Sequence, residues 1–471
     1  MEKYNQRRIT HWNEVAKKLR NWRGLGKYYN ARVCEIYQFN IPENQSVLEV
    51  GTGTGKILST LNPKRGLGID ISEGMIDLAR ETHPELEFRQ MDAVNFQISE
   101  KFDFVIMSDT INDLYDVQSA LENISRVLKT NGRLIINFYN RLWGLPLKIA
   151  ESLNLAKPNL TQNWLTVDDA KNLLDLAGFE TIKSWEEVIF PFSIPLIAPF
   201  FNKFLVRFWP FKHFAMTTFM VARPKPRTYS SKKPTVSIIV PARNEAGNIA
   251  SIFKRVLNVF QDPELIFVEG HSTDDTRGEI QKQIKAHPQT RASLYIQEGK
   301  GKGDAVRLGF SKASGDILMI LDADLTMPPE NLPRFYEAIV NGVGEFINGV
   351  RLVYPMEKHA MRFFNLIGNK FFSVVFTYLL GQPVKDTLCG TKALKRSDYL
   401  EIAENRSYFG DFDPFGDFDL LFGAAKLNLK IVDMPIRYAE RVYGETNIQR
   451  WRHGWLLLRM VAFAARRLKF I

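Results

Sequence analysis

Two aspartates, Asp322 and Asp324, stand one residue apart at the end of an apolar run, in the stretch ILDADLTMPP at residues 320–329. Alternate side chains of a strand point to the same side, so we expect these like charges to converge at one strand end. Mg²⁺ or Mn²⁺ would relieve their repulsion, because such ions prefer oxygen ligands and bridge carboxylates to phosphates. A metal-bound diphosphate is a good leaving group. The pair therefore predicts a metal site suited to sugar transfer from a nucleotide sugar.

The composition narrows the class of protein. With 471 residues, 45% of them hydrophobic and 24% charged, the chain should fold into two or three domains rather than stay disordered. Its net charge of +10 indicates anionic partners. The two cysteines, Cys34 and Cys389, support neither a zinc cluster nor a disulfide framework. We find no signal peptide and no apolar run of ~18 residues, so we expect a cytoplasmic protein.

A change of composition divides the chain. The stretch ARPKPRTYSSKKPTV at residues 222–236 lacks apolar periodicity and is typical of a linker. Short apolar strands alternate with helical stretches on both sides of it, which predicts two α/β domains with largely parallel sheets. The predicted parts are a first domain at 1–223 with a helical extension at 1–45, a linker at 224–234, a second domain at 235–448 and a tail at 449–471.

The first domain begins its sheet with SVLEVGTGTGKIL at residues 46–58. Glycines are needed where backbone approaches a ligand closely, but the third glycine comes one residue too early for a dinucleotide fingerprint. Acidic residues follow at the ends of later predicted strands, among them Asp70, Asp92 and Asp109. Asp70 is placed where a carboxylate can bind two ribose hydroxyls.

This succession, over roughly residues 40–223, resembles the class I S-adenosylmethionine-dependent methyltransferases, which have a Rossmann-like sheet. The resemblance implies that Asp70 binds the ribose, that Met75 and Asp92 flank the adenine, and that Asp109 lines the methyl-transfer side. It also implies that the methionine part of S-adenosylmethionine is bound by Glu49, Gly51, Gly53 and Gly55.

The methyl acceptor stays open. No N-P-P-Y-type tetrapeptide follows the fourth strand, which disfavours methylation of nucleic acid. Groups that could line an acceptor site, or simply pack or face solvent, are His11, Asp113, Tyr115 and Tyr139. The segment IFPFSIPLIAPFFNKFLVRFWPFKH at residues 189–213 is unusually aromatic; it either packs on its own domain or touches lipid. The first domain could also be a scaffold without activity.

The second domain begins with TVSIIVPARNEAGNI at residues 235–249, and a second strand ends at Glu269. The loop Gly301–Lys302–Gly303 is no P-loop, because neither Ser nor Thr follows the lysine. Together with the aspartate pair, these features resemble the family 2 glycosyltransferases of the GT-A fold over about residues 234–450. Two later stretches extend the resemblance to polyprenol-phosphate (dolichol-phosphate mannose type) synthases: DTLCGTKAL at 386–394 and PIRYAERVYGETN at 435–447.

That resemblance implies roles for single residues. The nucleotide-sugar site would include Pro241, Glu245, Glu269, Lys302 and Asp322. Phosphate groups of the acceptor would be bound by Arg351, Arg362 and Arg441, because guanidinium groups suit phosphate. We count Arg441 among the catalytic residues, with the two aspartates. One departure is EGHS after the second strand, where the family usually has an acidic pair.

The acceptor decides whether a base is needed. A phosphate acceptor is already an anion, whereas a sugar hydroxyl acceptor needs a general base near neutral pH. Asp417 lies nearest the position of that base in family members that glycosylate hydroxyls, but a structural helix cap is an equal alternative.

The tail favours a lipid acceptor. Residues 449–471 hold six Lys or Arg and no acid. Arg452, Arg459 and Arg466 recur every seven residues, as in an interfacial amphipathic helix. The segment at 361–381 is also aromatic and weakly basic. Both could instead be core helices. We therefore expect a bifunctional enzyme, peripheral on the cytosolic face of a membrane. Nucleic acid is not an expected partner, because the strand-end acids would repel phosphate without a metal.

Overall fold

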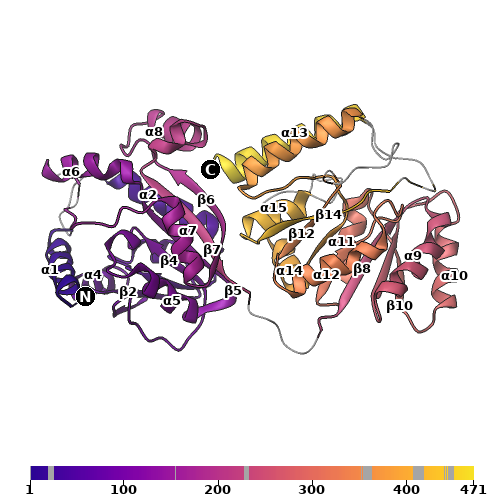
Figure 1. The fold of residues 1–471 in the computed structure, drawn as a ribbon, viewed down its shortest axis with the longest axis horizontal. Helices are drawn as coiled ribbons and strands as arrows, with labels where there is room; N and C mark the ends of the chain where they lie inside the picture. The colour runs from indigo at the N-terminus through magenta and orange to yellow at the C-terminus, as the bar shows by residue number, and fades with distance from the viewer. Residues whose placement is uncertain are drawn as a thin grey trace. The chain divides into compact units, whose positions relative to one another are not determined.

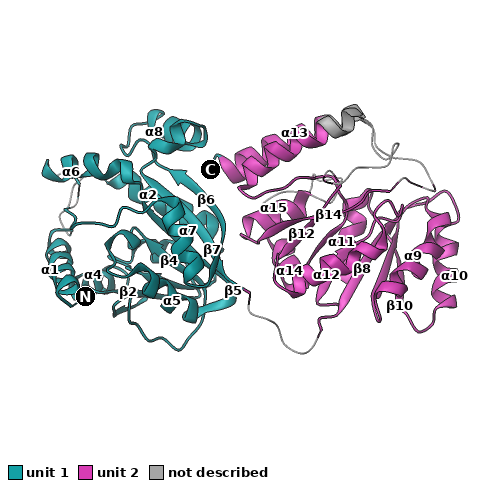
Figure 2. Ribbon diagram, viewed as in Figure 1, with its two compact units in different colours: residues 1–225, 470 teal, residues 226–469, 471 magenta. Residues whose placement is uncertain are grey.

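The computed structural model describes residues 2–19, 26–153, 155–156, 158–226, 233–351, 353, 363–406, 418–439, 441, 443 and 450–471; it describes no side chains for 363–367 and 450–454. The chain divides into two compact units (Figure 2). Unit 1 comprises residues 1–225 and 470, and unit 2 comprises residues 226–469 and 471. The division falls within the stretch predicted as a linker.

Unit 1 is built on a seven-stranded sheet of order β3-β2-β1-β4-β5-β7-β6 (Figure 1). Neighbouring strands from β3 to β5 are parallel, whereas β7 is antiparallel to both β5 and β6. The strands are β1 (Ser46–Val50), β2 (Arg65–Asp70), β3 (Glu87–Gln90), β4 (Phe102–Ser108), β5 (Leu128–Tyr139), β6 (Phe179–Glu187) and β7 (Thr217–Pro224).

Helices bury both faces of this sheet, so its central strands are apolar on both sides. Alternate residues of β1 face different cores: Leu48 packs with α5, and Val47 packs with α2. The helices are α1 (Glu2–Leu19), α2 (Lys27–Asn40), α3 (Lys56–Thr60), α4 (Glu73–Thr82), α5 (Val117–Val127), α6 (Gly144–Ser152), α7 (Val167–Leu176) and α8 (Ile197–Pro199). Shorter turns are η1 (Ile111–Asp113), η2 (Arg141–Trp143), η3 (Phe200–Phe204), η4 (Leu205–Arg207) and η5 (Phe211–Phe214).

Unit 2 has a second seven-stranded sheet, of order β10-β9-β8-β11-β13-β12-β14. β13 is antiparallel to β11 and to β12, and the other pairs are parallel. The strands are β8 (Val236–Ala242), β9 (Glu264–Glu269), β10 (Arg291–Ile296), β11 (Ile317–Ile320), β12 (Phe346–Val350), β13 (Lys392–Lys395) and β14 (Ile431–Pro435). Two mixed sheets with helices confirm the predicted α/β class.

Two helices of unit 2, α13 (Phe363–Leu380) and α16 (Arg450–Ala464), correspond to the segments for which the sequence predicted either membrane contact or core packing. The others are α9 (Ala246–Val259), α10 (Thr276–Ala286), α11 (Lys302–Lys312), η6 (Pro329–Asn331), α12 (Leu332–Val340), α14 (Arg396–Glu404), α15 (Phe418–Lys426) and η8 (Ala465–Lys469). Phe376 of α13 and Leu457 and Met460 of α16 share one buried core, while Trp455 and Leu458 are exposed. In the described part of the chain, no helix is long and apolar enough to cross a membrane.

Candidate active sites

The aspartate pair of unit 2 lies in a turn and not in a strand, because β11 ends at Ile320. The expectation that both side chains belong to a strand is therefore wrong. Asp324 Oδ1 accepts hydrogen bonds from the backbone N–H and the hydroxyl of Thr326, at 3.1 and 2.7 Å. Such local bonds of an aspartate compete with strand pairing and favour a turn. The turn still follows β11, at the edge of the sheet where parallel strands end.

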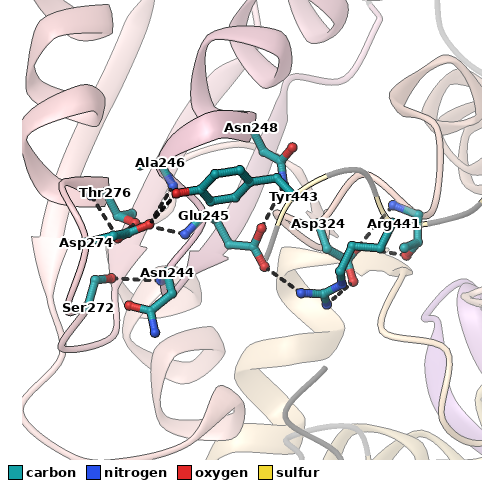
Figure 3. Close-up of polar contacts among 11 residues, drawn as sticks. Asn244, Glu245, Ala246, Asn248, Ser272, Asp274, Thr276, Asp324, Arg441 and Tyr443 are labelled. Atoms are coloured by element: carbon teal, nitrogen blue, oxygen red, sulfur yellow. Dashed lines mark hydrogen bonds and ion pairs between the residues drawn. The ribbon is translucent and has the colours of Figure 1, made fainter. Parts of the chain in front are cut away.

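Each aspartate faces a cation. Lys302, the first residue of α11, places Nζ 2.5 Å from Asp322 Oδ1. Arg441, which follows β14, lies 2.6 Å from Asp324 Oδ2 and 3.1 Å from Glu245 Oε1 (Figure 3). The structure thus brings together five of the residues predicted for this site, from segments separated by up to 196 positions in the sequence.

The electrostatics of these carboxyl groups differ. Burial acts to raise the pKa of Asp322, but Lys302, then Arg351 and Lys392, outweigh it and hold that pKa below its ordinary value. Burial raises the pKa of Glu245 to about 7, and the charge of Asp324 adds to this against the opposing effect of Arg441. Asp322 is therefore the firmly ionised member, as a metal ligand must be.

Two residues of the D-x-x-x-G stretch, Asp386 and Gly390, help to build the surroundings of the aspartate site. Asp386 accepts two hydrogen bonds from the guanidinium of Arg351, at 2.7 and 2.8 Å, and both side chains are buried. The backbone at Gly390, four residues after Asp386, lies against the side chains of Lys302 and Asp322. A Cβ atom at Gly390 would overlap Lys302 Nζ and both oxygens of Asp322. Glycine is required here by close approach.

Two of the residues predicted for the nucleotide site, Glu245 and Glu269, lie where the loop after β8 contacts the loop after β9. Asn244 Oδ1 accepts from the backbone N–H of Thr273, at 2.7 Å. Asp274 accepts from Ala246 N–H at the start of α9 and from the hydroxyl of Tyr443, at 3.2 and 3.3 Å (Figure 3). Buried Glu269 ends β9 and accepts from Ser272 N–H at 2.5 Å. Pro241, also predicted for this site, is half-buried within β8.

Sequence reasoning missed Asp274 and Tyr443. The available signal was TDDT at residues 273–276, directly after the EGHS departure, because it supplies an acid a short distance after Glu269. The ring of Tyr443 lies over the first turn of α9, where a Cβ atom at Gly247 would collide with it. Residues 441 and 443 thus cross the candidate site on the side of α9.

The residues predicted for the acceptor phosphate have different partners. Arg351 forms a buried ion pair with Asp386. Arg362 and the candidate base Asp417 lie outside the described residues. Of the predicted phosphate ligands, Arg441 lies at the aspartate site.

In unit 1, the glycine turn follows β1 with positive φ at Gly51 (74°), Gly53 (53°) and Gly55 (73°). A Cβ atom would collide with Thr110 at Gly51 and with Phe88 at Gly55, whereas nothing lies within 4 Å of one at Gly53. Two of these glycines are therefore explained by packing. The space beside Gly53 is open, as close approach of a ligand requires.

Two carboxyl groups hold this turn. Glu49 Oε2 accepts from the Thr52 hydroxyl at 2.7 Å and from Leu58 N–H at 3.2 Å. Burial raises the pKa of Glu49 to about 8. Asp70, at the end of β2, accepts from the backbone N–H groups of Gly53 and Ser72, at 2.9 Å each. Burial also raises the pKa of Asp70.

Helix α1 lies against the residues predicted to flank the adenine. Asn5 Nδ2 donates to Asp92 Oδ2 at 2.6 Å. Asn13 Oδ1 accepts from Gly74 N–H at 3.0 Å and contacts the Ser72 hydroxyl at 2.7 Å. Met75 is buried in a small core with residues of α1. The N-terminal helix therefore forms a wall of the candidate cofactor site.

Asp109 follows β4 with φ 55° and lies in a polar cluster. Its carboxylate accepts from the Tyr29 hydroxyl at 2.8 Å and from Asn137 Nδ2 at 2.7 Å. Tyr139, at the end of β5, stacks on Tyr29 with ring centroids 5.8 Å apart. This places one of the possible acceptor groups, Tyr139, beside the residue predicted to line the methyl-transfer side.

The other possible acceptor groups have structural partners. Asp113 binds Arg8 at 3.1 Å and Trp12 Nε1 at 2.7 Å. His11 lies 2.9 Å from the carbonyl of Pro158 on the surface, and exposed Tyr115 packs edge-to-face on Tyr4. These contacts favour the packing and surface interpretations that the sequence left open.

Two family models match the chain. Residues 237–402 match glycosyl transferase family 2, and residues 41–178 match a methyltransferase domain. Each match lies within one of the two units and covers the glycine turn or the aspartate pair.

Known proteins similar to this chain fall into the same two groups. A dolichol-phosphate mannosyltransferase of Pyrococcus furiosus is 30% identical over 219 residues, which cover 45% of this chain and 59% of that protein. An undecaprenyl-phosphate 4-deoxy-4-formamido-L-arabinose transferase of Proteus mirabilis is 24% identical over 217 residues, 45% of this chain and 62% of that protein. The chain thus spans about three fifths of the length of these relatives.

Solved structures align with one unit at a time. A S-adenosylmethionine-dependent methyltransferase of Thermotoga maritima aligns with a TM-score of 0.37 and 20% identity, over 46% of this chain and 99% of that one. Glucosyl-3-phosphoglycerate synthase of Mycobacterium tuberculosis, solved with Mn²⁺ and uridine diphosphate, aligns with a TM-score of 0.36 and 20% identity, over 50% and 80%.

Proposed function

The chain carries a methyltransferase domain and a family 2 glycosyltransferase domain, and from this premise we propose that it is a bifunctional transferase. Unit 2 transfers a sugar, with inversion, from a nucleotide sugar to a polyprenyl-phosphate-type lipid at the cytosolic face of a membrane. Unit 1 methylates a small-molecule, sugar or lipid-linked substrate with S-adenosylmethionine. The observation that carries the sugar transfer is the balance of Asp322 and Asp324 by two cations at the end of β11.

The donor set of unit 2 suits Mg²⁺ or Mn²⁺. Asp322 and Asp324 offer hard oxygen ligands. Among the residues that the structure describes, no group of three or more His, Cys, Asp or Glu side chains could hold a metal. Two carboxylates leave positions for water and phosphate oxygens, which is the usual binding of Mg²⁺ beside substrate phosphates. A bound ion would neutralise charge on the diphosphate.

Lys302 and Arg441 have a second task in this proposal. Both are donors without acceptor capacity, and a bound diphosphate offers them oxygen atoms in place of the aspartates. We expect Arg441 to turn from Asp324 to a phosphate when the donor binds. This movement would expose the Asp324 carboxylate and place a guanidinium beside the departing nucleotide.

The substitution Asp324→Asn tests the metal site. The amide oxygen can still accept the Thr326 N–H, so the turn should survive, but the charge is lost. We expect sugar transfer to fall by at least roughly 100-fold, the loss typical of removing one group from a preorganised electrostatic site. Metal-dependent thermal shifts with several nucleotide sugars provide the binding measurement. Asp262→Asn, an exposed change in the same unit, is the control. Full activity of Asp324→Asn, or in excess EDTA, would contradict the proposal.

The names of the relatives support a lipid-phosphate acceptor, because both describe transfer involving a polyprenyl phosphate. The alternative is a sugar hydroxyl acceptor with Asp417 as the base. Asp417→Asn separates the two: it should leave transfer to polyprenyl phosphate within about tenfold of the wild type and abolish transfer to a hydroxyl.

The open space beside Gly53 and the N–H groups around it support S-adenosylmethionine binding in unit 1. Calorimetry on the full chain should detect binding of S-adenosylmethionine, and Gly53→Arg should remove it by filling that space. Gln38→Arg, on the exposed side of α2, is the matched control. A folded wild type that binds no S-adenosylmethionine would favour the scaffold alternative for this domain.

A further inference from the structure

Unit 1 exposes a set of large apolar side chains at one end of its sheet. Two segments supply them: residues 142–153, which include α6, and residues 192–214, between β6 and β7 (Figure 1). We call these the apolar surface of unit 1. Its exposed members are Leu142, Leu145, Ile149, Leu153, Phe192, Ile194, Leu196, Ile197, Phe200, Phe204, Phe208, Trp209, Phe211 and Phe214.

Four of these residues have the spacing of an interfacial helix. Leu142, Leu145, Ile149 and Leu153 recur every three or four positions and form one stripe along η2 and α6. Leu145 is 70% exposed, Leu196 87% and Trp209 76%. Single exposed apolar residues are ordinary, but so many large ones from two segments joined by a hydrogen bond indicate an interaction site.

The apolar surface is held in place by buried polar contacts. Asn202 is fully buried; its Oδ1 accepts from the N–H groups of Ile189 and Phe190, at 2.8 Å each. Glu187, at the end of β6, binds Arg207 at 2.5 Å and Arg32 of α2 at 3.2 Å. Because buried groups of this kind are costly to leave unpaired, these contacts fix which side chains point outward.

Hydrogen bonds join the two segments. Trp143 Nε1 donates to the carbonyl of Phe214 at 2.9 Å, and Asn140 Nδ2 donates to the carbonyl of His213 at 3.2 Å. The junction directly follows Tyr139, the last residue of β5. The apolar surface therefore lies at the carboxyl end of the central strands, the same end as the candidate methyl-transfer side.

The charge of this region selects the kind of partner. From residue 188 to residue 244 the sequence has no Asp or Glu, while Lys203 and Lys212 fall within the segment at residues 192–214. Aromatic rings, tryptophan above all, favour the boundary between lipid and water, and basic residues are attracted to anionic headgroups. The acid-free aromatic and basic segment at residues 192–214 thus fits an anionic bilayer.

We propose that unit 1 itself docks on an anionic bilayer through this apolar surface. Leu196, Phe200 and Trp209 enter the boundary between headgroups and acyl chains, and Lys203 and Lys212 face the phosphates. The partner is a lipid surface, so docking requires no second protein.

The test uses the full chain with one fluorescent label. Cys34 and Cys389 are buried, so an NBD group can be attached selectively to Leu196→Cys. Vesicles that contain phosphatidylglycerol should shift its emission to the blue and brighten it severalfold. The control is Gln97→Cys, an exposed position in the connection between β3 and β4 and outside both segments of the apolar surface; its label should not respond.

Three results would overturn the proposal. The label at Leu196→Cys could stay unchanged while a label at Leu458→Cys on α16 responds, which would leave only the tail at the membrane. It could be blue-shifted before vesicles are added, which would mean that protein covers this surface. It could respond to protein concentration instead, which would indicate a second copy as the partner.

A second measurement does not use labels. Leu196→Asp together with Trp209→Asp should reduce binding of the full chain to the same vesicles by roughly tenfold or more. Both side chains are exposed, so the thermal midpoint should not change. Unaltered vesicle binding by a folded double variant would contradict the proposal.

Discussion

At the scale of single residues, each candidate site contains a carboxyl group that burial keeps from ionising freely. Glu49 lies beneath the glycine turn of unit 1, and its pKa is raised to about 8. In the unfolded chain the same group has its ordinary pKa of 4.5. The folded state therefore holds a proton that the unfolded state releases, so this group's contribution to stability is complete below pH 4.5 and is lost as the pH rises to about 8.

The substitution Glu49→Gln should remove this loss. Glutamine can accept the same bonds from Thr52 and Leu58 and cannot ionise. We expect the thermal midpoint of unit 1 in the wild type to fall between pH 5 and pH 9, and that of Glu49→Gln to fall less. Calorimetric scans across this range provide the measurement. Glu43→Gln, exposed and close in sequence, should behave as the wild type; equal slopes in all three proteins would contradict the assignment.

The residue types of both sites could be predicted, but their partners could not. The glycines and strand-end acids stand in short local patterns, which the sequence displays directly. The ion pair of Arg441 with Asp324 joins residues 117 positions apart, and only the fold brings them together. The ion pair of Arg351 with Asp386 could not be predicted for the same reason. A local pattern predicts which residues can do chemistry, and not which of them the fold uses for support.

At the scale of elements, α1 contacts the cofactor site along most of its length. Asn5 hydrogen-bonds to Asp92, and Asn13 hydrogen-bonds to the start of α4. Arg8 and Trp12 hydrogen-bond to Asp113. The sequence predicted a helical extension but could not show where it packs, because all these contacts are long-range. Asp113, considered as an acceptor group, is instead the point at which α1 is attached.

If α1 is a wall of the S-adenosylmethionine site, loosening it should weaken binding. Asn5→Ala and Asn13→Ala together remove hydrogen bonds at two points, each contributing ~1 kcal/mol. We expect the dissociation constant for S-adenosylmethionine to rise roughly 10- to 30-fold, measured by calorimetry. Thr10→Ala, which removes only a bond within α1, is the control. An unchanged constant in a folded double variant would show that α1 merely packs against the unit.

The end of β11 is a second case at this scale. The apolar run predicted a strand that includes the aspartates, yet β11 ends before them. Thr326 bonds to Asp324 locally, and Leu325 has φ 55°. The alternation of residues in a sequence cannot reveal that a side chain will satisfy the backbone of its own turn.

At the scale of the whole molecule, the net charge of +10 is spread over two units that each present aromatic and basic surface. Because part of the tail is buried in unit 2, a test of membrane binding should not delete it. Leu457, Met460 and Ala464 of α16 are buried in that core, so deleting the tail would expose apolar surface and destabilise the unit. Charge reversal on the exposed side of the helix avoids this.

The last prediction follows from that design. Arg459 and Arg466 lie on the exposed side of the tail, and each basic residue near an anionic bilayer contributes about 1 kcal/mol. Arg459→Glu with Arg466→Glu should therefore weaken binding to anionic vesicles by at least roughly 30-fold in flotation assays. Transfer to a polyprenyl phosphate embedded in those vesicles should slow, and transfer to a soluble acceptor should not.

The matched control is Lys282→Glu with Lys285→Glu on α10, an exposed pair in the same unit that changes the net charge equally. Both double variants should respond to salt in the same sense, because screening at 0.1 M acts over ~10 Å. Equal vesicle binding by the two would mean that overall charge, rather than the tail, brings the protein to the membrane. A wild type that ignores vesicles and glycosylates only soluble sugars would leave the hydroxyl acceptor as the remaining explanation.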